Sequence, residues 1–197
     1  MFKLKQYFIL TFVLVLFITC ARVSKKVPII SVKFLNPEIK KEVNAFEITN
    51  HLNESFKFEE LEGKVHLVSF FFATCTTICP AMERELLPIV KSNKEEHIKF
   101  LSFTIDPERG DISVLNERAE LLGNNKNWIF LNTSKPNLKR IASIYLSAIK
   151  NDEDDVFYHT SQVVLLDKKM RIRGLYDILN AEELSILKTD IAILLKE

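Results

Sequence analysis

The sequence predicts one α/β domain, and three observations support this class. An apolar run, 65–72, is rich in β-branched and aromatic residues and too short for an isolated helix, which is typical of a strand buried on both faces. A helical apolar stripe follows it, with Met82, Leu86 and Val90 on one face. With 197 residues, 47% of them hydrophobic and 27% charged, most of the chain can form one domain with a sizeable core.

Net charge and cysteine count narrow the function classes. The formal net charge is +1, which argues against a polyanionic partner, so we expect no nucleic acid. Three cysteines are too few for a disulfide scaffold. Cys20 stands alone, whereas Cys75 and Cys79 form a close pair, so the two groups need separate explanations.

The N-terminus has the features of an export signal. Lys3 and Lys5 precede an apolar run, 7–18, which is too short for a comfortable membrane span and fits the apolar core of a signal peptide. The run ends in the letters FITC at Cys20, which resembles a bacterial lipobox. We therefore expect a signal peptide, 1–19, and lipidation of Cys20. The alternative is an uncleaved signal anchor with an inert cysteine. Either way, the domain is membrane-anchored in a bacterial cell envelope, outside the cytoplasm, where disulfides are permitted.

The segment 20–45 is polar and mixed in charge, so we expect a membrane tether there, with at most one short strand at 29–34. The domain is predicted to span 46–197. It begins with two alternating stretches, 46–48 and 56–58, which are separated by polar residues and predict an N-terminal β-hairpin. A turn, 61–64, then leads into the buried strand.

Strands and helices alternate through the rest of the chain. Asp111 and Asn180 are suited to cap helix N-termini, and Gly123 is suited to end a helix. After the strand 65–72 and its helix, the predicted elements are a strand at 98–105, a helix after Asp111, a strand at 128–131, a helix opened by Pro136, a hairpin of 162–167 and 170–176, and a last helix after Asn180. This order, with cysteines after the first buried strand, predicts a thioredoxin-like fold with an N-terminal β-hairpin and insertions.

The cysteine pair lies in the loop between the central strand and the first helix. Pro80 follows Cys79 at a place where proline favours the first turn of a helix. We therefore place Cys79 at the helix N-terminus, where backbone N–H groups and the helix dipole favour thiolate over thiol. A purely structural disulfide between Cys75 and Cys79 is a weak alternative, because such a short loop constrains the unfolded chain little.

In a thioredoxin-like fold, the loop before the late hairpin faces the cysteine loop. Ordinary thioredoxins have a cis-proline there, but the last proline of this chain is Pro136, and His159 stands before the hairpin strand instead. A histidine opposite two cysteines completes a set of two sulfurs and one nitrogen, suited to Cu(I) or, with further ligands, to Zn. The alternative for His159 alone is a hydrogen-bonded structural histidine. His51, His66 and His97 receive no role.

These residues resemble the Sco (SenC) family, membrane-anchored copper proteins with a thioredoxin fold that serve assembly of cytochrome oxidase. The resemblance rests on FEITN from Phe46, LEGK from Leu61, FFFATCTTICP at 70–80, SFTIDPER at 102–109, and HT at His159 followed by LLD. It implies a metallochaperone that binds a copper ion through Cys75, Cys79 and His159 for the copper centre of cytochrome oxidase. The implied partner is the copper-binding subunit of that oxidase or another copper or thiol protein of the envelope.

The chain departs from the family pattern in three places. Thr76 and Thr77 stand where the family often has proline and an acidic residue, Gly110 interrupts the acidic continuation of DPER, and 168–170 lacks the usual hairpin glycine. None of these is an implied ligand. Asp106 is a candidate acid or base beside the ligands. The alternative is that Asp106 only ends its strand.

A different class of function is a thiol-disulfide reductase acting on an envelope protein, in which one cysteine attacks and the other resolves the mixed disulfide. The three-residue spacing of the cysteines and the missing cis-proline argue against a reductase. Copper binding and disulfide reduction do not exclude each other, however. A third possible function is that of a peroxiredoxin, because TTICP at 76–80 is similar to the T-x-x-C-P motif around a peroxidatic cysteine. That motif requires a proline seven residues before the cysteine, where this chain has Phe72. We therefore expect a copper-binding protein rather than an enzyme.

Overall fold

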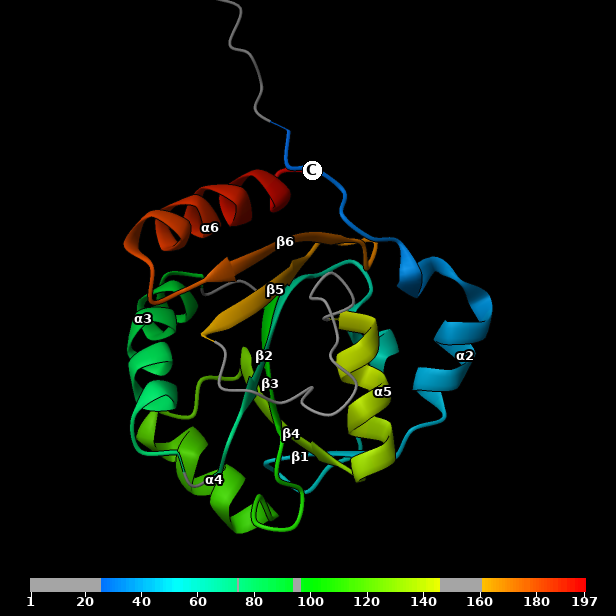
Figure 1. Ribbon diagram of the computed structural model, residues 1–197, viewed down its shortest axis with the longest axis vertical. Helices are drawn as coiled ribbons and strands as arrows, with labels where there is room; N and C mark the ends of the chain where they lie inside the picture. Colours follow the sequence, from blue (N-terminus) through cyan, green and yellow to red (C-terminus); the bar gives the residue numbers. More distant parts are fainter. Residues whose placement is uncertain (1–25, 74, 94–96, 146–160) are drawn as a thin grey trace, which may run out of the picture.

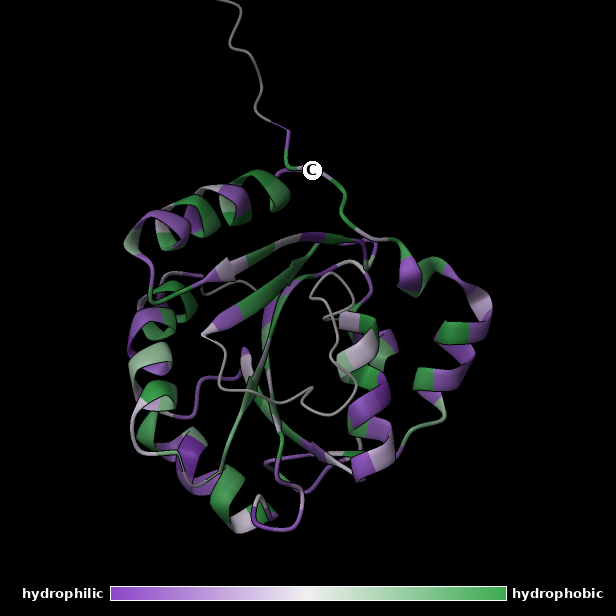
Figure 2. Ribbon diagram, viewed as in Figure 1, coloured by the Kyte–Doolittle hydropathy of each residue, from purple (hydrophilic) through white to green (hydrophobic). Residues whose placement is uncertain are grey.

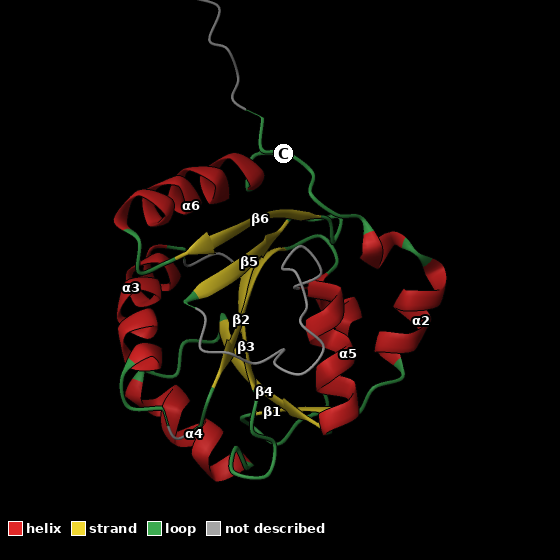
Figure 3. Ribbon diagram, in the orientation of Figure 1, coloured by secondary structure: helices red, strands yellow, loops and turns green. Residues whose placement is uncertain are grey.

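The computed structural model describes residues 26–73, 75–93, 97–145 and 161–197. Within them, one sheet of six strands in the order β1-β4-β3-β2-β5-β6 forms the centre of the molecule (Figures 1 and 3). Its strands are β1 Ile48–Asn50, β2 Val65–Phe71, β3 Ile98–Thr104, β4 Trp128–Thr133, β5 Gln162–Leu166 and β6 Ile172–Asp177. The predicted signal peptide, Cys20 and His159 lie outside the described residues. The α/β class predicted from the sequence is confirmed.

The three central strands are parallel, and the outer ones are antiparallel to their neighbours. β2 pairs with β3 and β3 with β4 in parallel, whereas β5, β6 and β1 add antiparallel pairs. β2 is buried on both faces, as its unbroken apolar run predicts. The carboxyl ends of β2, β3 and β4 therefore meet at one edge of the sheet, and the cysteine loop follows β2 there.

Helices cover both faces of the sheet. One face carries α3 Ile78–Ser92, α4 Ile112–Leu121 and α6 Ala181–Leu194, and the other carries α2 Pro37–Asn44 and α5 Lys135–Tyr145 (Figure 1). Green apolar bands on these helices face the sheet in Figure 2. The predicted caps are confirmed: Asp111 accepts a hydrogen bond from the Val114 N–H, and Asn180 accepts from two N–H groups of the first turn of α6.

The predicted N-terminal hairpin is wrong in its second arm. Ser55 forms a single bridge with Thr49, and the chain then turns into a short 3₁₀ helix, η2, Phe58–Leu61. β1 pairs instead with β4. The physical reason is burial: Phe58 and Leu61, three residues apart, both enter the core, which a helical turn allows and a strand with alternating faces does not.

The fold also includes residues before 46, in the stretch where the sequence predicts a tether. Val27, Phe34 and Val43 are buried, Phe34 lying in a second 3₁₀ helix, η1, Lys33–Leu35. Ser31 bridges to Ile172 at the edge of β6, so the short strand predicted around it is reduced to one bridge. The polar composition of 26–45 hides these few apolar contacts, which come from widely spaced residues.

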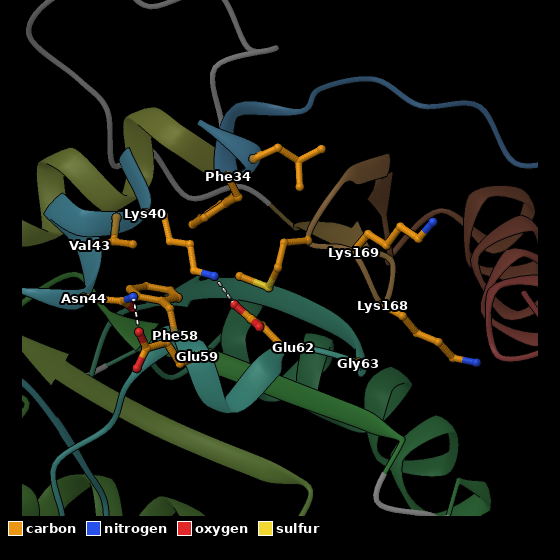
Figure 4. A pocket seen from close by; sticks show the side chains of 12 residues that line it. Phe34, Lys40, Val43, Asn44, Phe58, Glu59, Glu62, Gly63, Lys168 and Lys169 are labelled. Carbon is orange, nitrogen blue, oxygen red and sulfur yellow. Dashed lines mark hydrogen bonds and ion pairs between the residues drawn. The ribbon is translucent and has the colours of Figure 1, made fainter. Parts of the chain in front are cut away.

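A cavity of about 420 Å³ lies where this segment meets the sheet (Figure 4). Phe34, Val43, Phe58 and Met170 provide its apolar lining, and Lys40 pairs with the Glu62 carboxylate. The cavity opens beside the turn between β5 and β6 and next to the residues that precede β2. It therefore lies at the amino end of β2, whereas the cysteine loop follows the carboxyl end. Among the described residues, no helix is long and apolar enough to cross a bilayer.

Candidate metal centre

The cysteine loop connects the carboxyl end of β2 to the first turn of α3. Phe71 pairs with Thr104, so the residues after β2 and β3 leave the sheet at the same edge. α3 begins at Ile78, and Pro80 lies in its first turn, as predicted. Cys75 is half-buried and precedes the helix, whereas Cys79 is its second residue and is buried. Both are free thiols.

The helix N-terminus acts on Cys75. The Cys79 backbone N–H donates to the Cys75 Sγ at 3.3 Å. Burial acts to raise the pKa of the Cys75 thiol, but hydrogen bonds from the Cys79 thiol and from the backbone N–H groups of Cys79, Thr77 and Ile78 outweigh it and lower that pKa. Cys75 is thus the cysteine prepared to be a thiolate.

Cys79 has the opposite character. Burial, together with its hydrogen bond to Cys75, raises the pKa of the Cys79 thiol to about 12. The expectation that the helix N-terminus favours a thiolate at Cys79 is therefore wrong. The N–H groups of the first turn point back at the sulfur of the preceding loop, while the side chain of the second helical residue turns into the core.

An ion pair beneath the loop was not found from the sequence. Arg118 of α4 lies with its Nε 2.5 Å from the Glu83 Oε1, and its Nη1 donates to the Ala73 carbonyl at 3.5 Å. Its guanidinium carbon lies 5.2 Å from the centre of the Phe71 ring. The Arg118 and Glu83 side chains are only 12% and 15% exposed, and Glu83 lies one turn after Cys79. One sequence signal indicates a partly buried charge at Arg118, because this residue falls beside the apolar stripe of its helix, but the signal does not identify Glu83 as the partner.

Asp106 and the other histidines show no contact with the cysteines. The Asp106 carboxylate lies 3.6 Å from the Arg109 Nε, so its role beside the ligands stays a prediction. His51 Nδ1 accepts from the Phe130 N–H at 3.3 Å, and His66 is buried near the amino end of β2. Within the part of the chain that the structure describes, no group of three or more His, Cys, Asp or Glu residues could hold a metal ion. The predicted third ligand, His159, lies outside that part.

The two thiols can do two kinds of chemistry. Two sulfurs in one half-buried loop, one of them already favoured as thiolate, suit a soft monovalent metal ion. The same pair can exchange with a disulfide, since the half-buried Cys75 sulfur attacks and the buried Cys79 sulfur resolves. Both uses need Cys75 and Cys79 together, which is the arrangement that the structure provides.

Comparisons with known proteins agree on one family. The model of the SCO1/SenC family matches residues 36–193. The SCO1 protein homolog of Bacillus subtilis is 31% identical over 131 residues, which cover 64% of this chain and 68% of that protein.

Solved structures agree as well. BsSco, described as a member of the Sco family of cytochrome c oxidase assembly proteins with a disulfide switch, shares 26% identity with a TM-score of 0.64, covering 78% of this chain and 92% of that one. Yeast Sco1, solved with copper bound, is similar in fold, with a TM-score of 0.59, 20% identity, and coverage of 73% and 83%. These similarities confirm the predicted thioredoxin-like fold.

Proposed function

Because the chain belongs to the SCO1/SenC family, we propose that it is a copper chaperone which carries Cu(I) to the copper centre of cytochrome oxidase. Two similar proteins support the proposal: BsSco is described as an assembly protein of cytochrome c oxidase, and yeast Sco1 has been solved with copper. The proposed ligands are Cys75, Cys79 and His159.

The observation that carries the proposal is the contact between the Cys79 N–H and the Cys75 Sγ. It holds the two sulfurs in one loop and stabilises a thiolate before any metal arrives. Cys75 is the more exposed sulfur and meets the ion first. The buried Cys79 keeps its proton until the metal displaces it, so loading releases protons. Release follows by exchange of these ligands for cysteines or histidines of the partner.

The path of the sheet supports His159 as the third donor. β5 runs antiparallel to β2, with Val164 opposite Val68. The amino end of β5 therefore lies toward the carboxyl end of β2, where the cysteine loop begins. Ser161, the first described residue before β5, enters the sheet at that edge, and His159 precedes it by two residues. Imidazole supplies a neutral nitrogen donor that suits Cu(I) beside two thiolates.

We propose membrane attachment through the N-terminus, with lipidation of Cys20 after removal of 1–19 as the first candidate and an uncleaved anchor as the second. The domain then lies outside the cytoplasm in the cell envelope. Radiolabelled palmitate should attach to the parent and not to Cys20→Ser. Retention of Cys20→Ser in the membrane fraction would favour the uncleaved anchor.

A direct test of the proposal is anaerobic Cu(I) loading of the reduced full chain against a competing chelator. We expect one tightly held Cu(I) in the parent, and loss of that binding in Cys75→Ser and in Cys79→Ser. Protein oxidised to the Cys75–Cys79 disulfide should also fail to bind, because a disulfide offers no thiolate. Tight binding by the disulfide form would contradict the assigned ligands.

The second candidate function is disulfide reduction, favoured by the different pKa values of the two thiols. The Cys75 thiolate would attack a partner disulfide and form a mixed disulfide. Cys79 would then attack the Cys75 sulfur, releasing the partner as a dithiol and leaving the Cys75–Cys79 disulfide, with two electrons transferred. His159 has no part in these steps, so reduction of a partner disulfide by His159→Ala separates the two functions.

A further inference from the structure

The first described segment of the chain forms a fixed outer surface of the domain. The Ile30 N–H donates to the Ile172 carbonyl at 2.7 Å, and Ser31 bridges the same residue at the free edge of β6. The Arg173 guanidinium donates to the carbonyls of Val27 and Pro28. Figure 1 shows this segment, in blue, running along β6 past the C-terminus toward α2. The segment is therefore part of the rigid domain, and its exposed side chains form a defined surface.

This surface is apolar to an extent that the rest of the described chain is not. Ile29, Ile30, Val32 and Leu35 are 51%, 47%, 50% and 51% exposed. They are four of the eight large hydrophobic side chains exposed in the described part, gathered within seven residues, whereas the other four are spread between residues 52 and 186. Concentrated exposure of this kind marks an interaction surface.

Lysines surround these apolar side chains. Lys26 and Lys196 line a hollow together with Ile29, and Leu35 lines the cavity of Figure 4 together with Lys168 and Lys169. Lys33 lies exposed within the segment, where Glu38 is the nearest exposed carboxylate along the chain. The carboxylates of Asp167 and Glu197 are already paired with arginines. Glu59 and Glu62 also line the cavity, where Glu62 pairs with Lys40 and Glu59 accepts from Asn44. Apolar side chains with lysines beside them fit the boundary of an anionic lipid surface.

The residues that precede the described fold supply the reason to choose a lipid surface. The apolar run predicted to direct the protein to the membrane ends at residue 18, and the described fold begins at Lys26. The eight residues 19–26 span at most about 29 Å when fully extended. A domain attached at Cys20, or through the apolar run itself, is therefore held with this surface close to the lipid.

We propose that the surface formed by Ile29, Ile30, Val32 and Leu35 with its surrounding lysines docks on an anionic membrane and fixes the orientation of the domain. This inference rests on the membrane attachment proposed above and is independent of the copper ligands.

Docking in this orientation presents the cysteine loop away from the lipid. Ser31 of the segment that carries the docking surface pairs with Ile172 of β6. Ile172 pairs with Leu166 of β5, and Leu166 pairs with His66, so this segment lies level with the start of β2. The cysteine loop follows Phe71 at the other end of that strand. The seven residues of β2 span about 20 Å, which separates the two ends of the sheet. The proposed copper site then faces a partner domain that stands above the membrane.

Depth-dependent quenching of tryptophan fluorescence tests the proposal on the full chain in vesicles of phosphatidylcholine and phosphatidylglycerol. Ile30→Trp places the probe in the surface, and Leu121→Trp places a control at a 78% exposed position of α4. α4 lies at the far end of the molecule from the segment (Figure 1). The native Trp128 is buried and gives the same background in both variants. Lipids brominated on their acyl chains should quench Ile30→Trp strongly and Leu121→Trp no more than the parent.

Equal quenching of both probes, or none of either, would overturn the proposal, because a domain that tumbles on its tether or stays away from the lipid gives those results. Ile30→Trp should also lose quenching when Lys33→Glu and Lys169→Glu are added or when phosphatidylglycerol is omitted. Quenching that is indifferent to both changes would overturn the electrostatic part. Cu(I) titration of Ile30→Trp should match the parent, so failure of docking is distinguishable from failure of the copper function.

Discussion

The Arg118 guanidinium and the Glu83 carboxylate form a largely buried ion pair beneath the cysteine loop, with 2.5 Å between Nε and Oε1. Burial raises the pKa of the Glu83 carboxyl, and Arg118 opposes that rise. Arg118 also bonds the Ala73 carbonyl, so the pair ties the loop to α3 and α4. Two thiolates around Cu(I) carry one net negative charge, and the two partners act on that charge with opposite signs.

We therefore predict opposite shifts for the two single variants. Arg118→Gln removes the positive charge and should weaken Cu(I) binding on the order of tenfold, whereas Glu83→Gln leaves Arg118 uncompensated and should strengthen it. Chelator competition measures both. Arg140→Gln is the matched control, because Arg140 forms a more exposed ion pair with Glu42, with 2.7 Å between Nε and Oε1, and its loss should have no effect. Weaker binding in both variants would mean that the pair acts only by holding the loop in place.

The two cysteines should differ in reactivity. Iodoacetamide modification of the reduced protein, followed by peptide mass spectrometry, should label Cys75 at a pH below that needed for an ordinary thiol. Cys79 should remain unlabelled in the folded protein, because its pKa of about 12 leaves almost no thiolate and its sulfur is buried. Faster labelling of Cys79 than of Cys75 would contradict the assigned roles.

The sequence predicts the central part of this site because local patterns specify it. The apolar run of β2, the helical stripe of α3 and the proline after Cys79 place both cysteines correctly between strand and helix. The direction of each side chain is not a local property. Whether the N–H groups of the first turn reach Cys75 or Cys79 depends on which sulfur the core covers. Because the core covers Cys79, the favoured thiolate is Cys75 and not the expected Cys79.

Other features depend on contacts between residues far apart in the chain. Val27 and Phe34 stand among lysines and prolines, so nothing in their neighbourhood indicates that they enter the core. Arg118 meets Glu83 across two helices, a pairing that one sequence does not reveal. These long-range contacts explain why the domain boundary and the ion pair beneath the loop could not be predicted.

The buried contacts before residue 46 make a prediction about truncation. A chain that lacks 1–25 keeps all described contacts and should unfold cooperatively. A chain that lacks 1–45 loses the burial of Val27, Phe34 and Val43, each worth about 1.5–3 kcal/mol, and leaves the cavity wall open. Thermal unfolding followed by circular dichroism should show a large loss of stability or no transition for the shorter chain. Equal melting temperatures would restore the boundary at 46.

His66 should make the protein sensitive to mild acid. Burial, the largest influence, lowers the pKa of its imidazole to about 4, and its Nε2 has no hydrogen-bond partner. The unfolded chain binds the proton below about pH 6.5 while the folded one does not, so stability is complete above pH 6.5 and falls on acidification toward pH 4. The loss is on the order of 3 kcal/mol over that range.

Urea unfolding at several pH values measures this loss, and His66→Gln is the variant to compare. Glutamine does not titrate, so the fall in unfolding free energy between pH 6.5 and pH 4 should be smaller in His66→Gln than in the parent. The same fall in both proteins would assign the acid sensitivity to other groups.

The central claim is a copper site built from both cysteines and His159, and anaerobic Cu(I) titration of His159→Ala against a competing chelator tests it most directly. His97→Ala is the matched control, since His97 is exposed and lies in a turn directly before β3. Losing a contact that only orients a metal ligand costs roughly 10–100-fold in affinity, so losing a ligand should cost at least that much. We predict such a loss for His159→Ala and unchanged binding for His97→Ala. Parental affinity in His159→Ala would contradict the proposed site and leave disulfide reduction as the better account of the cysteine pair.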